Sequence, residues 1–257
     1  HIHKEYETFN ERTFSIIHFG GGTPTILNVD QIKEINSIIN ESIIRSNEYE
    51  YTWESSPETI IGSNSEKLRV LLEEGVNRLS IGIESFEEYL LKACGRRHNT
   101  EEAINSFFIA REKGFDNINL DLIYGLAYQT IDDWTKTIDQ TIELSPDCVT
   151  TYHLRMKPGT QMASLPVEKF PSEDICRMMF ITAIEKFTAA GYVQVLGNQF
   201  ARDSKKIYKY EVEKYKDNRD IIGIGVSAYS YLNGWAYYNH RTLLEYFENL
   251  DLGKLSI

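Results

Sequence analysis

Short runs of apolar, β-branched and aromatic residues alternate along the chain with longer stretches in which apolar residues recur at helical spacing. Runs of the first kind predict β-strands, and stretches of the second kind predict α-helices. The predicted strands cover residues 13–19, 49–53, 78–83, 117–123, 148–154 and 192–196. The predicted helices cover residues 30–46, 65–74, 86–94, 100–113, 131–143 and 172–190. Thr100, followed by two glutamates, is expected to cap the N-terminus of the helix that it opens.

This alternation predicts an α/β fold with a parallel sheet, because parallel strands need helical crossovers. The strands are apolar on both faces, which is typical of strands covered by helices on both sides. Five or six such units favour a partial barrel over an open, doubly wound sheet. We therefore expect residues 1–197 to form a partial barrel and residues 198–257 to form an α+β extension packed on it.

The pattern is looser in the C-terminal extension, residues 198–257. Residues 201–220 are rich in Lys, Tyr and Asp and are expected to form a solvated connection. Residues 220–228 predict a further strand, and residues 241–250 predict a last helix. The glycines at 223 and 225 are interpreted as a close-packed turn, since no clear helix follows as a dinucleotide-binding motif requires. The many tyrosines of this region are expected to form a packing surface.

Polar residues and glycines stand where the predicted strands end. Because the carboxyl ends of parallel strands meet at one rim of a barrel, these residues are expected to lie together. The three successive glycines have no Cβ, so the loop can take positive φ and a ligand can touch its amides. The residues at the strand ends are Gly20, Gly21, Gly22, Thr23, Glu54, Glu84, Ser85, Asp121, Tyr152 and His153.

This set suits a ligand that carries an ammonium group, a ribose diol and a carboxylate. The carboxylates of Glu54 and Asp121 accept from ammonium or hydroxyl donors, glycine amides pair with a carboxylate, and Arg96 supplies a bidentate counter-charge. Asp121 is the sharpest signal, because it interrupts an apolar run where an unpaired carboxylate is costly.

Each of these residues also has a structural interpretation. The glycine loop can be a tight turn alone, and Glu54 or Arg96 a solvated surface residue. His98 can cap the following helix, and His153 can be a hydrogen-bonded core residue.

Composition narrows the class of protein. The chain has 257 residues, of which 42% are hydrophobic and 25% charged, as is ordinary for a globular protein. The net charge of −11 makes nucleic acid and anionic membranes poor partners. Three isolated cysteines, Cys94, Cys148 and Cys176, fit a reducing, cytoplasmic setting and form no metal-binding motif. Because the first residue is not Met, we expect a fragment or a processed chain.

Several stretches of the chain together resemble one known family. They are HFGGGTPTIL at 18–27, EGVNRLSIGIESF at 74–86, GRRH at 95–98, NINLDLIYGL at 117–126, LSPDCVTTYHL at 144–154 and GIGVSAYS at 223–230. These stretches resemble the radical S-adenosylmethionine superfamily, in the branch of oxygen-independent coproporphyrinogen III oxidase. The resemblance implies a partial (β/α)6 barrel of the TIM type, here without its first βα unit. It also implies two cofactors, S-adenosylmethionine and a 4Fe-4S cluster.

The resemblance also implies roles for individual residues. Gly20, Gly21, Gly22 and Thr23 would hold the methionine end of S-adenosylmethionine, and Glu54, Arg96 and Asp121 match further cofactor-binding positions. Glu84 stands where the family has Gln, which adds a negative charge near a sulfonium cofactor. Arg155 occupies the position of a second cofactor contact, where the family has a small residue. The sequence therefore leaves open whether one or two molecules of S-adenosylmethionine bind.

The family binds its cluster through a CxxxCxxC loop upstream of the glycine loop, and this chain begins too late to contain that loop. The three isolated cysteines are not expected to replace it. We therefore expect no metal ligands in this chain, and we expect the fragment itself to be inactive.

The activity implied by the resemblance is reductive cleavage of S-adenosylmethionine to a 5′-deoxyadenosyl radical. The radical would act on a porphyrinogen or a related aromatic small molecule, with an electron donor such as flavodoxin or ferredoxin. Alternatives within the superfamily are a methyltransferase or cyclase of natural-product or haem-degradation type, and a haem chaperone. The chaperone ranks lower, because residues 208–220 contain no HNxxYW-type stretch. Independently of the resemblance, Glu54, Glu84 and Asp121 could bind a divalent metal, since hard cations prefer oxygen ligands.

Overall fold

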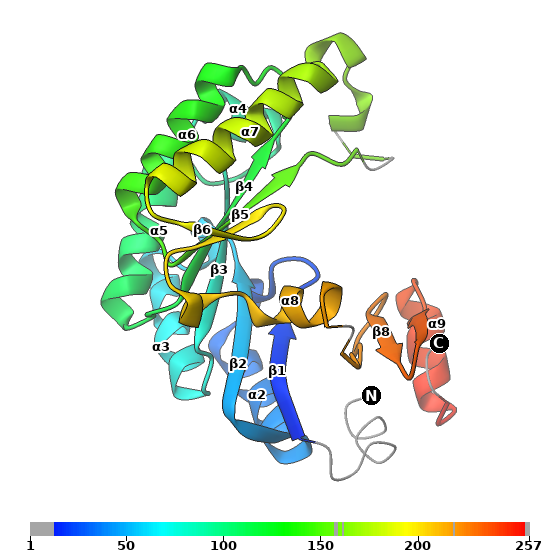
Figure 1. The fold of residues 1–257 in the computed structure, drawn as a ribbon. Helices are drawn as coiled ribbons and strands as arrows, with labels where there is room; N and C mark the ends of the chain where they lie inside the picture. Colours follow the sequence, from blue (N-terminus) through cyan, green and yellow to red (C-terminus); the bar gives the residue numbers. More distant parts are fainter. Residues whose placement is uncertain (1–12, 157–158, 161, 218, 255–257) are drawn as a thin grey trace.

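A curled, seven-stranded sheet forms the centre of the computed structural model, which describes residues 13–156, 159–160, 162–217 and 219–254 (Figure 1). The first five strands are parallel neighbours in chain order. In sheet order the strands are β1 (Thr13–Phe19), β2 (Ile44–Ser55), β3 (Arg78–Glu84), β4 (Ile118–Tyr124), β5 (Cys148–His153), β7 (Gln199–Ala201) and β6 (Val193–Leu196). This curled half-barrel confirms the predicted α/β fold class.

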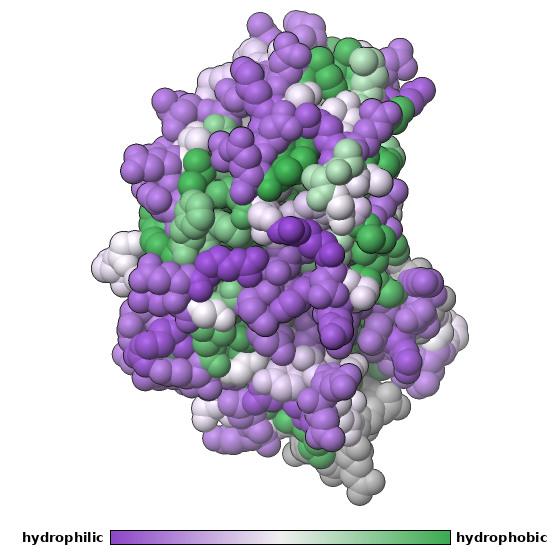
Figure 2. Space-filling view, turned by 60° about the vertical axis from the view of Figure 1, so that its left-hand side comes forward, coloured by the Kyte–Doolittle hydropathy of each residue, from purple (hydrophilic) through white to green (hydrophobic). Residues whose placement is uncertain are grey.

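Helices cover the outer, convex face of the sheet (Figure 1). They are α2 (Val29–Ser42), α3 (Glu66–Glu73), α4 (Glu88–Ala93), α5 (Thr100–Lys113), α6 (Ile131–Leu144) and α7 (Glu173–Ala189). Short 3₁₀ helices lie in the connections, at Pro24–Ile26, Pro57–Thr59, Gly62–Ser65, Met162–Ser164, Val167–Lys169 and Ser204–Lys206. The helical side of the molecule is largely hydrophilic at its surface (Figure 2), as expected where this layer faces water. Among the described residues, no helix has both the length and the apolar character that crossing a bilayer requires.

Local capping explains where several helices begin. The Asn28, Asn99 and Thr130 side chains each accept the backbone N–H three residues later, in capping boxes that satisfy otherwise unpaired amides. The expectation for Thr100 was therefore wrong by one residue. Its hydroxyl instead donates to the carbonyl of Phe86 at 2.7 Å, and the Asn99 carboxamide is the cap.

Alternation along the strands divides the sheet into two chemically different faces. Residues such as Trp53, Leu79 and Leu120 are fully buried in the core between sheet and helices. Burial of such large side chains is worth about 1.5–3 kcal/mol each. Trp134 joins two helices of this layer, because its indole N–H donates to the carbonyl of Met179 at 2.8 Å. The helices are thus held on the sheet mainly by apolar contacts.

The opposite, concave face carries polar residues at the alternate positions. They include Glu50, Thr52 and Glu54 on β2, Arg78 and Ser80 on β3, Asn119 and Asp121 on β4, and Cys148 and Thr150 on β5. A residue two positions along a strand lies on the same face. The concave face therefore supplies a continuous set of polar side chains that leads to the strand ends.

The sheet departs from the prediction at one edge. Residues 192–196 were expected to add a sixth parallel strand, but β7 lies between β5 and β6 and runs antiparallel to both. The chain reverses at Gly197 and Asn198, and the Asn198 carbonyl accepts the N–H of Thr151 at 2.8 Å. At the other end of the sheet, the helix predicted to reach residue 46 ends at Ser42, because extended Ile43 leads directly into β2.

The expectation of a solvated connection over residues 201–220 was wrong. This part of the C-terminal extension contains α8 (Lys209–Tyr215), which lies across the concave side of the sheet in front of β2 and β1 (Figure 1). The buried Glu50 carboxylate accepts the N–H groups of Lys209 and Tyr210, at 3.0 and 3.3 Å. An anion at a helix N-terminus is favourable, so Glu50 fixes where α8 begins.

The remainder of the C-terminal extension is a hairpin, β8 (Tyr229–Leu232) and β9 (Trp235–Tyr238), followed by α9 (Leu243–Asp251). The strand predicted over residues 220–228 is not formed, and only an isolated bridge joins Ile221 to Tyr231 there. The close-packed turn is confirmed. A Cβ added to Gly223 would clash with the Tyr229 carbonyl, and the Asn239 amide donates to the Gly223 carbonyl at 3.0 Å.

Candidate functional site

The glycine loop after β1 packs directly against the end of β2. The N–H of Gly21 donates to Oε2 of Glu54 at 3.2 Å, and Oε1 of the same carboxylate lies 3.2 Å from Nε2 of His18. A Cβ added to Gly20 would stand 2.5 Å from Cδ of Glu54 and 2.6 Å from Nε2 of His18. Glycine at position 20 is therefore required by this close approach, as the bare backbone of the loop suggested.

The other side of the glycine loop is open. Gly21 and Gly22 are exposed, Gly21 has φ of 91°, and a Cβ on either would meet no atom within 4 Å. Thr23 ends the loop, and its carbonyl accepts the N–H of Ile26 to start a 3₁₀ helix. The loop therefore presents a free face that can receive a ligand carboxylate.

His18 is fixed by aromatic residues from the C-terminal extension. Its Nδ1 lies 2.8 Å from the Tyr208 hydroxyl, and its ring stacks on Tyr210 at 4.8 Å between ring centres. Burial raises the pKa of the Tyr208 phenol well above its usual value, so that phenol remains a donor. A hydroxyl donating to Nδ1 leaves the imidazole proton on Nε2, where it donates to Glu54.

Glu84 and Arg96 form an ion pair at the end of β3. Glu84 has φ of 67° and follows an irregularity in the pairing of β3 with β4, and its side chain is 9% exposed. The Arg96 guanidinium lies 3.0 Å from the place of a Cβ on Gly82, so this strand position must also be small. Arg96 thus neutralises the charge that Glu84 brings to the site.

Asp121, on β4, is half-buried and held by two donors. The Asn119 amide donates to Oδ1 and the Ser80 hydroxyl to Oδ2, both at 2.8 Å. Burial, with a smaller effect of the Glu54 charge, raises the pKa of Asp121 to about 6, against the lowering effect of the Ser80 hydrogen bond. Asp121 pairs in register with Gly82, so it stands beside the strand position that Arg96 covers.

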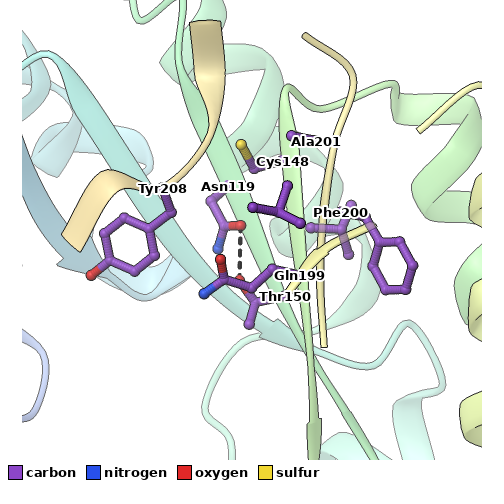
Figure 3. A pocket seen from close by; sticks show the side chains of 9 residues that line it. Asn119, Cys148, Thr150, Gln199, Phe200, Ala201 and Tyr208 are labelled. Atoms are coloured by element: carbon purple, nitrogen blue, oxygen red, sulfur yellow. Dashed lines mark hydrogen bonds between the residues drawn. The ribbon is translucent and has the colours of Figure 1, made fainter. Parts of the chain in front are cut away.

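A small, closely packed pocket lies below this rim (Figure 3). Asn119 and Thr150 project from β4 and β5 and are joined by a hydrogen bond of 3.0 Å, and Tyr208 reaches the same pocket from the C-terminal extension. A groove of about 1000 Å³ opens on the other side of the rim. It runs along β1 and the glycine loop, with Tyr210 and residues 219–229 on its opposite wall.

The remaining sequence candidates differ in how they lie relative to this group. Tyr152, near the end of β5, is on the concave face two positions from Thr150, and the negative charge of Asp121 together with burial raises the pKa of its phenol, so Tyr152 lies close to the group. His153 is exposed and stacks on Tyr124 rather than entering the core. Arg155 lies on the exposed segment after β5, and no described contact joins it to the other candidates. His98 is buried and does not cap a helix, because its ring nitrogens face the Glu58 carboxylate and the Ile83 carbonyl, each at 3.3 Å.

Sequence reasoning missed three residues of the site. His18 lies two residues before Gly20, and its position near the end of a strand was the available signal. Arg78 sits at the start of β3 on the concave face, where period-two alternation from Ser80 places it. Tyr208 was not recoverable, because its contact with His18 spans 190 residues of sequence.

A metal centre is not present among the described residues, where no group of three or more His, Cys, Asp or Glu side chains could hold an ion. The three cysteines are free and separate, and Cys148 donates to the Lys206 carbonyl at 2.7 Å. The alternative of a divalent metal bound by Glu54, Glu84 and Asp121 is not supported, because the Glu84 carboxylate is already paired with Arg96.

Comparison with known proteins agrees with this geometry. The model of the radical SAM superfamily matches residues 1–141, and the chain therefore belongs to that superfamily. Radical SAM proteins bind S-adenosylmethionine and a 4Fe-4S cluster. The resemblance of the sequence motifs to this family is thereby confirmed.

Among curated relatives, the chain is 33% identical over 222 residues to the haem chaperone HemW of Bacillus subtilis, covering 85% of the chain and 57% of that protein. It is 30% identical over 261 residues to the oxygen-independent coproporphyrinogen III oxidase of Pseudomonas aeruginosa, covering 96% and 56%. The structure of coproporphyrinogen III oxidase from Escherichia coli superposes with a TM-score of 0.86 at 27% identity, covering 99% of the chain and 62% of that structure. The chain thus spans little more than half the length of the curated relatives.

Proposed function

We propose that this chain forms the S-adenosylmethionine site of a radical SAM enzyme that acts on a porphyrinogen. The observation that carries the proposal is the glycine loop locked against Glu54, with Asp121 on β4 and with Arg96, from the loop after α4, paired with Glu84 at the end of β3. Polar groups at the carboxyl ends of parallel strands are where barrels of this type bind their ligands. The bound sulfonium supplies radical chemistry, and the protein supplies binding, orientation and exclusion of water.

The residues present fit S-adenosylmethionine. Its carboxylate would lie on the open face of Gly21 and Gly22, where no side chain intrudes. Its ammonium group would meet Glu54, whose side chain is 36% exposed although both oxygens already have a protein partner. The ribose hydroxyls would donate to Asp121, a carboxylate that is positioned by Ser80 and Asn119.

The paired Glu84 and Arg96 also belong to this proposed site. Their ion pair leaves little net charge on that side of the cofactor, so the Glu at position 84 does not add an unbalanced anion. Arg155 is proposed as a further, outer contact. The described residues offer no ligand set for the 4Fe-4S cluster.

The substrate class rests on the relatives. A coproporphyrinogen oxidase aligns with 96% of the chain, and the coproporphyrinogen oxidase structure covers 99% of it. A haem chaperone is the second candidate, because the haem chaperone of Bacillus subtilis shares 33% identity. Both candidates bind a tetrapyrrole, and they differ in whether S-adenosylmethionine is consumed.

The experiment uses the anaerobically reconstituted full-length protein with a chemical reductant. An enzyme of the proposed class releases 5′-deoxyadenosine, and adding coproporphyrinogen III increases that release with loss of the porphyrinogen. Saturable, one-to-one haem binding without substrate-dependent release of 5′-deoxyadenosine would overturn the oxidase in favour of the chaperone. The control is Gly197→Ala, a loop glycine that is exposed and has open space around its Cβ position.

A further inference from the structure

The C-terminal extension contacts His18, close to the glycine loop, through the Tyr208 hydroxyl and the Tyr210 ring. The Tyr208 hydroxyl lies 2.8 Å from Nδ1 of His18, although the two residues are 190 positions apart. Tyr208 immediately precedes α8, whose start is fixed by the Glu50 carboxylate on β2. The position of this hydroxyl is therefore set by the sheet itself.

A chain of directed contacts continues from this hydroxyl to the loop. Tyr208 donates to Nδ1 of His18, and Nε2 of the same ring donates to Oε1 of Glu54 at 3.2 Å. The other oxygen of Glu54 accepts the N–H of Gly21 at 3.2 Å. The Glu54 carboxylate only accepts, from the Gly21 N–H and from Nε2–H of His18, so the neutral imidazole is left with Nδ1 as the acceptor for the Tyr208 hydroxyl.

The imidazole has little freedom to leave this arrangement. Tyr210 stacks on one face of the ring, with an angle of 12° between the planes, and the Tyr208 ring lies beside it at 5.9 Å. Arg78 covers the far side of the Tyr208 ring, with 3.9 Å from its guanidinium carbon to the ring centre. When the hydrogen-bond partners of a functional carboxylate are fixed by contacts of their own, the carboxylate is restricted to a narrow range of orientations.

We infer that Tyr208 and His18 are positioning residues that orient the Glu54 carboxylate for S-adenosylmethionine, so that the C-terminal extension controls cofactor affinity from outside the barrel. The inference rests on the proposed function of the strand-end site. It assigns to the extension a role in cofactor binding that its sequence does not indicate. Neither positioning residue needs to touch the cofactor, because both act through Glu54.

The test is a double-mutant cycle on the full-length protein, with S-adenosylmethionine binding measured by calorimetry. Tyr208→Phe removes only the hydroxyl, and it should weaken binding about three- to tenfold. His18→Gln keeps an N–H near the position of Nε2 but has no acceptor at Nδ1, and it should retain most of the affinity. His18→Leu removes both groups and should weaken binding about tenfold or more.

The decisive readout is the coupling between the two positions. In the His18→Gln background, Tyr208→Phe should have no further effect, because the acceptor for the hydroxyl is already gone. Equal losses in both backgrounds would mean that Tyr208 acts only on overall structure and would overturn the inference. Tyr238→Phe, a tyrosine of the same extension that is 56% exposed, is the matched control and should bind like the wild type.

A second readout follows the proton on His18 directly. Selective ¹⁵N labelling of histidine, with His18→Gln to assign the signal, should show the Nε2–H tautomer in the wild type and a mixed population in Tyr208→Phe. An unchanged tautomer would overturn the inference even if affinity falls. Wild-type protein that does not bind S-adenosylmethionine would instead overturn the proposed function, whereas normal binding by Tyr208→Phe would overturn the positioning role alone.

Discussion

The guanidinium carbon of Arg78 lies 3.9 Å from the centre of the Tyr208 ring, with Arg78 fully buried at the start of β3. None of its three guanidinium nitrogens has a hydrogen-bond partner among the described residues. Burial by itself lowers the pKa of Arg78, but Cys148, Glu50 and the aromatic neighbour raise it, so the group stays charged. Cation–π attraction and the Glu50 carboxylate therefore hold the C-terminal extension on the concave face.

Replacing this buried cation should loosen the extension. Arg78→Met removes the cation that faces the Tyr208 ring and whose charged form Glu50 favours, and it should lower the free energy of unfolding by about 2 kcal/mol, as expected for a desolvated cation–π contact. Urea unfolding monitored by fluorescence measures the change. Arg69→Met is the control, because the Arg69 side chain is 51% exposed and its ion pairs, screened by solvent, should contribute little to stability. An unchanged stability for Arg78→Met would contradict the anchoring role.

Gly20→Ala separates binding from stability. The added Cβ meets the ends of the Glu54 and His18 side chains and no backbone atom, so the free energy of unfolding should change by less than about 1 kcal/mol. The alignment of Glu54 with the Gly21 amide is lost, and S-adenosylmethionine affinity should fall about tenfold or more. Thermal unfolding and calorimetric titration give the two values, with Gly197→Ala as the control. A loss of stability without a loss of affinity would be the opposite of this expectation.

Gly223→Ala should, in contrast to Gly20→Ala, lower the stability of the C-terminal extension. Here the added Cβ meets the backbone of Tyr229 instead of a mobile side-chain end. Overpacking against backbone should cost about 1–3 kcal/mol. Limited proteolysis should cut the variant faster within residues 219–240, while the barrel stays resistant. Equal proteolysis of variant and wild type would show that the turn has more space than its contacts indicate.

The raised pKa of Asp121 gives a signed pH dependence. With a pKa of about 6 in the folded state against 3.8 in model compounds, the protonated carboxyl is favoured by folding. Its stabilising contribution is fully present below pH 3.8 and is lost as the pH rises through 6. Stability of the wild type relative to Asp121→Asn should therefore fall between pH 4 and pH 7.5, by roughly 1–3 kcal/mol.

Urea unfolding of both proteins at several pH values measures this difference in the free energy of unfolding. Contributions of titrating groups that are the same in both proteins cancel in the difference. The exposed Asp132, changed to Asn, is the matched control and should give a difference that does not vary in this range. A flat difference for Asp121→Asn as well would contradict the environment assigned to that carboxyl.

Periodicity was enough to predict the parallel sheet, and with it that several of the candidate site residues would lie together. The glycine loop follows β1, Glu54 lies at the end of β2, and Asp121 interrupts the apolar run of β4; parallel topology brings these residues to one side of the sheet. Glu54 and Asp121 were recognisable because a carboxylate near a buried run needs a partner. Arg96 was recognisable only as a nearby cation, and its pairing with Glu84 required the structure.

The C-terminal extension was not predictable in the same way. β7 has three residues and α8 has seven, which are too few to show a reliable period. The lysines and tyrosines of residues 205–210 are typical of a surface loop, and long-range contacts, such as those of Tyr208 and Tyr210 with β1 and β2, make them part of the folded structure. Glu50 and Arg78 lie on different strands, and the sequence did not show that their charges are close enough to interact.

Hydrogen exchange of the full-length protein, measured by mass spectrometry with and without saturating S-adenosylmethionine, tests the central claim most directly. The account predicts slower exchange in peptides that contain Gly20–Thr23, Glu54 and Asp121, and no change in the peptide covering α9. Full occupancy of S-adenosylmethionine with unchanged exchange at those three strand ends would contradict it.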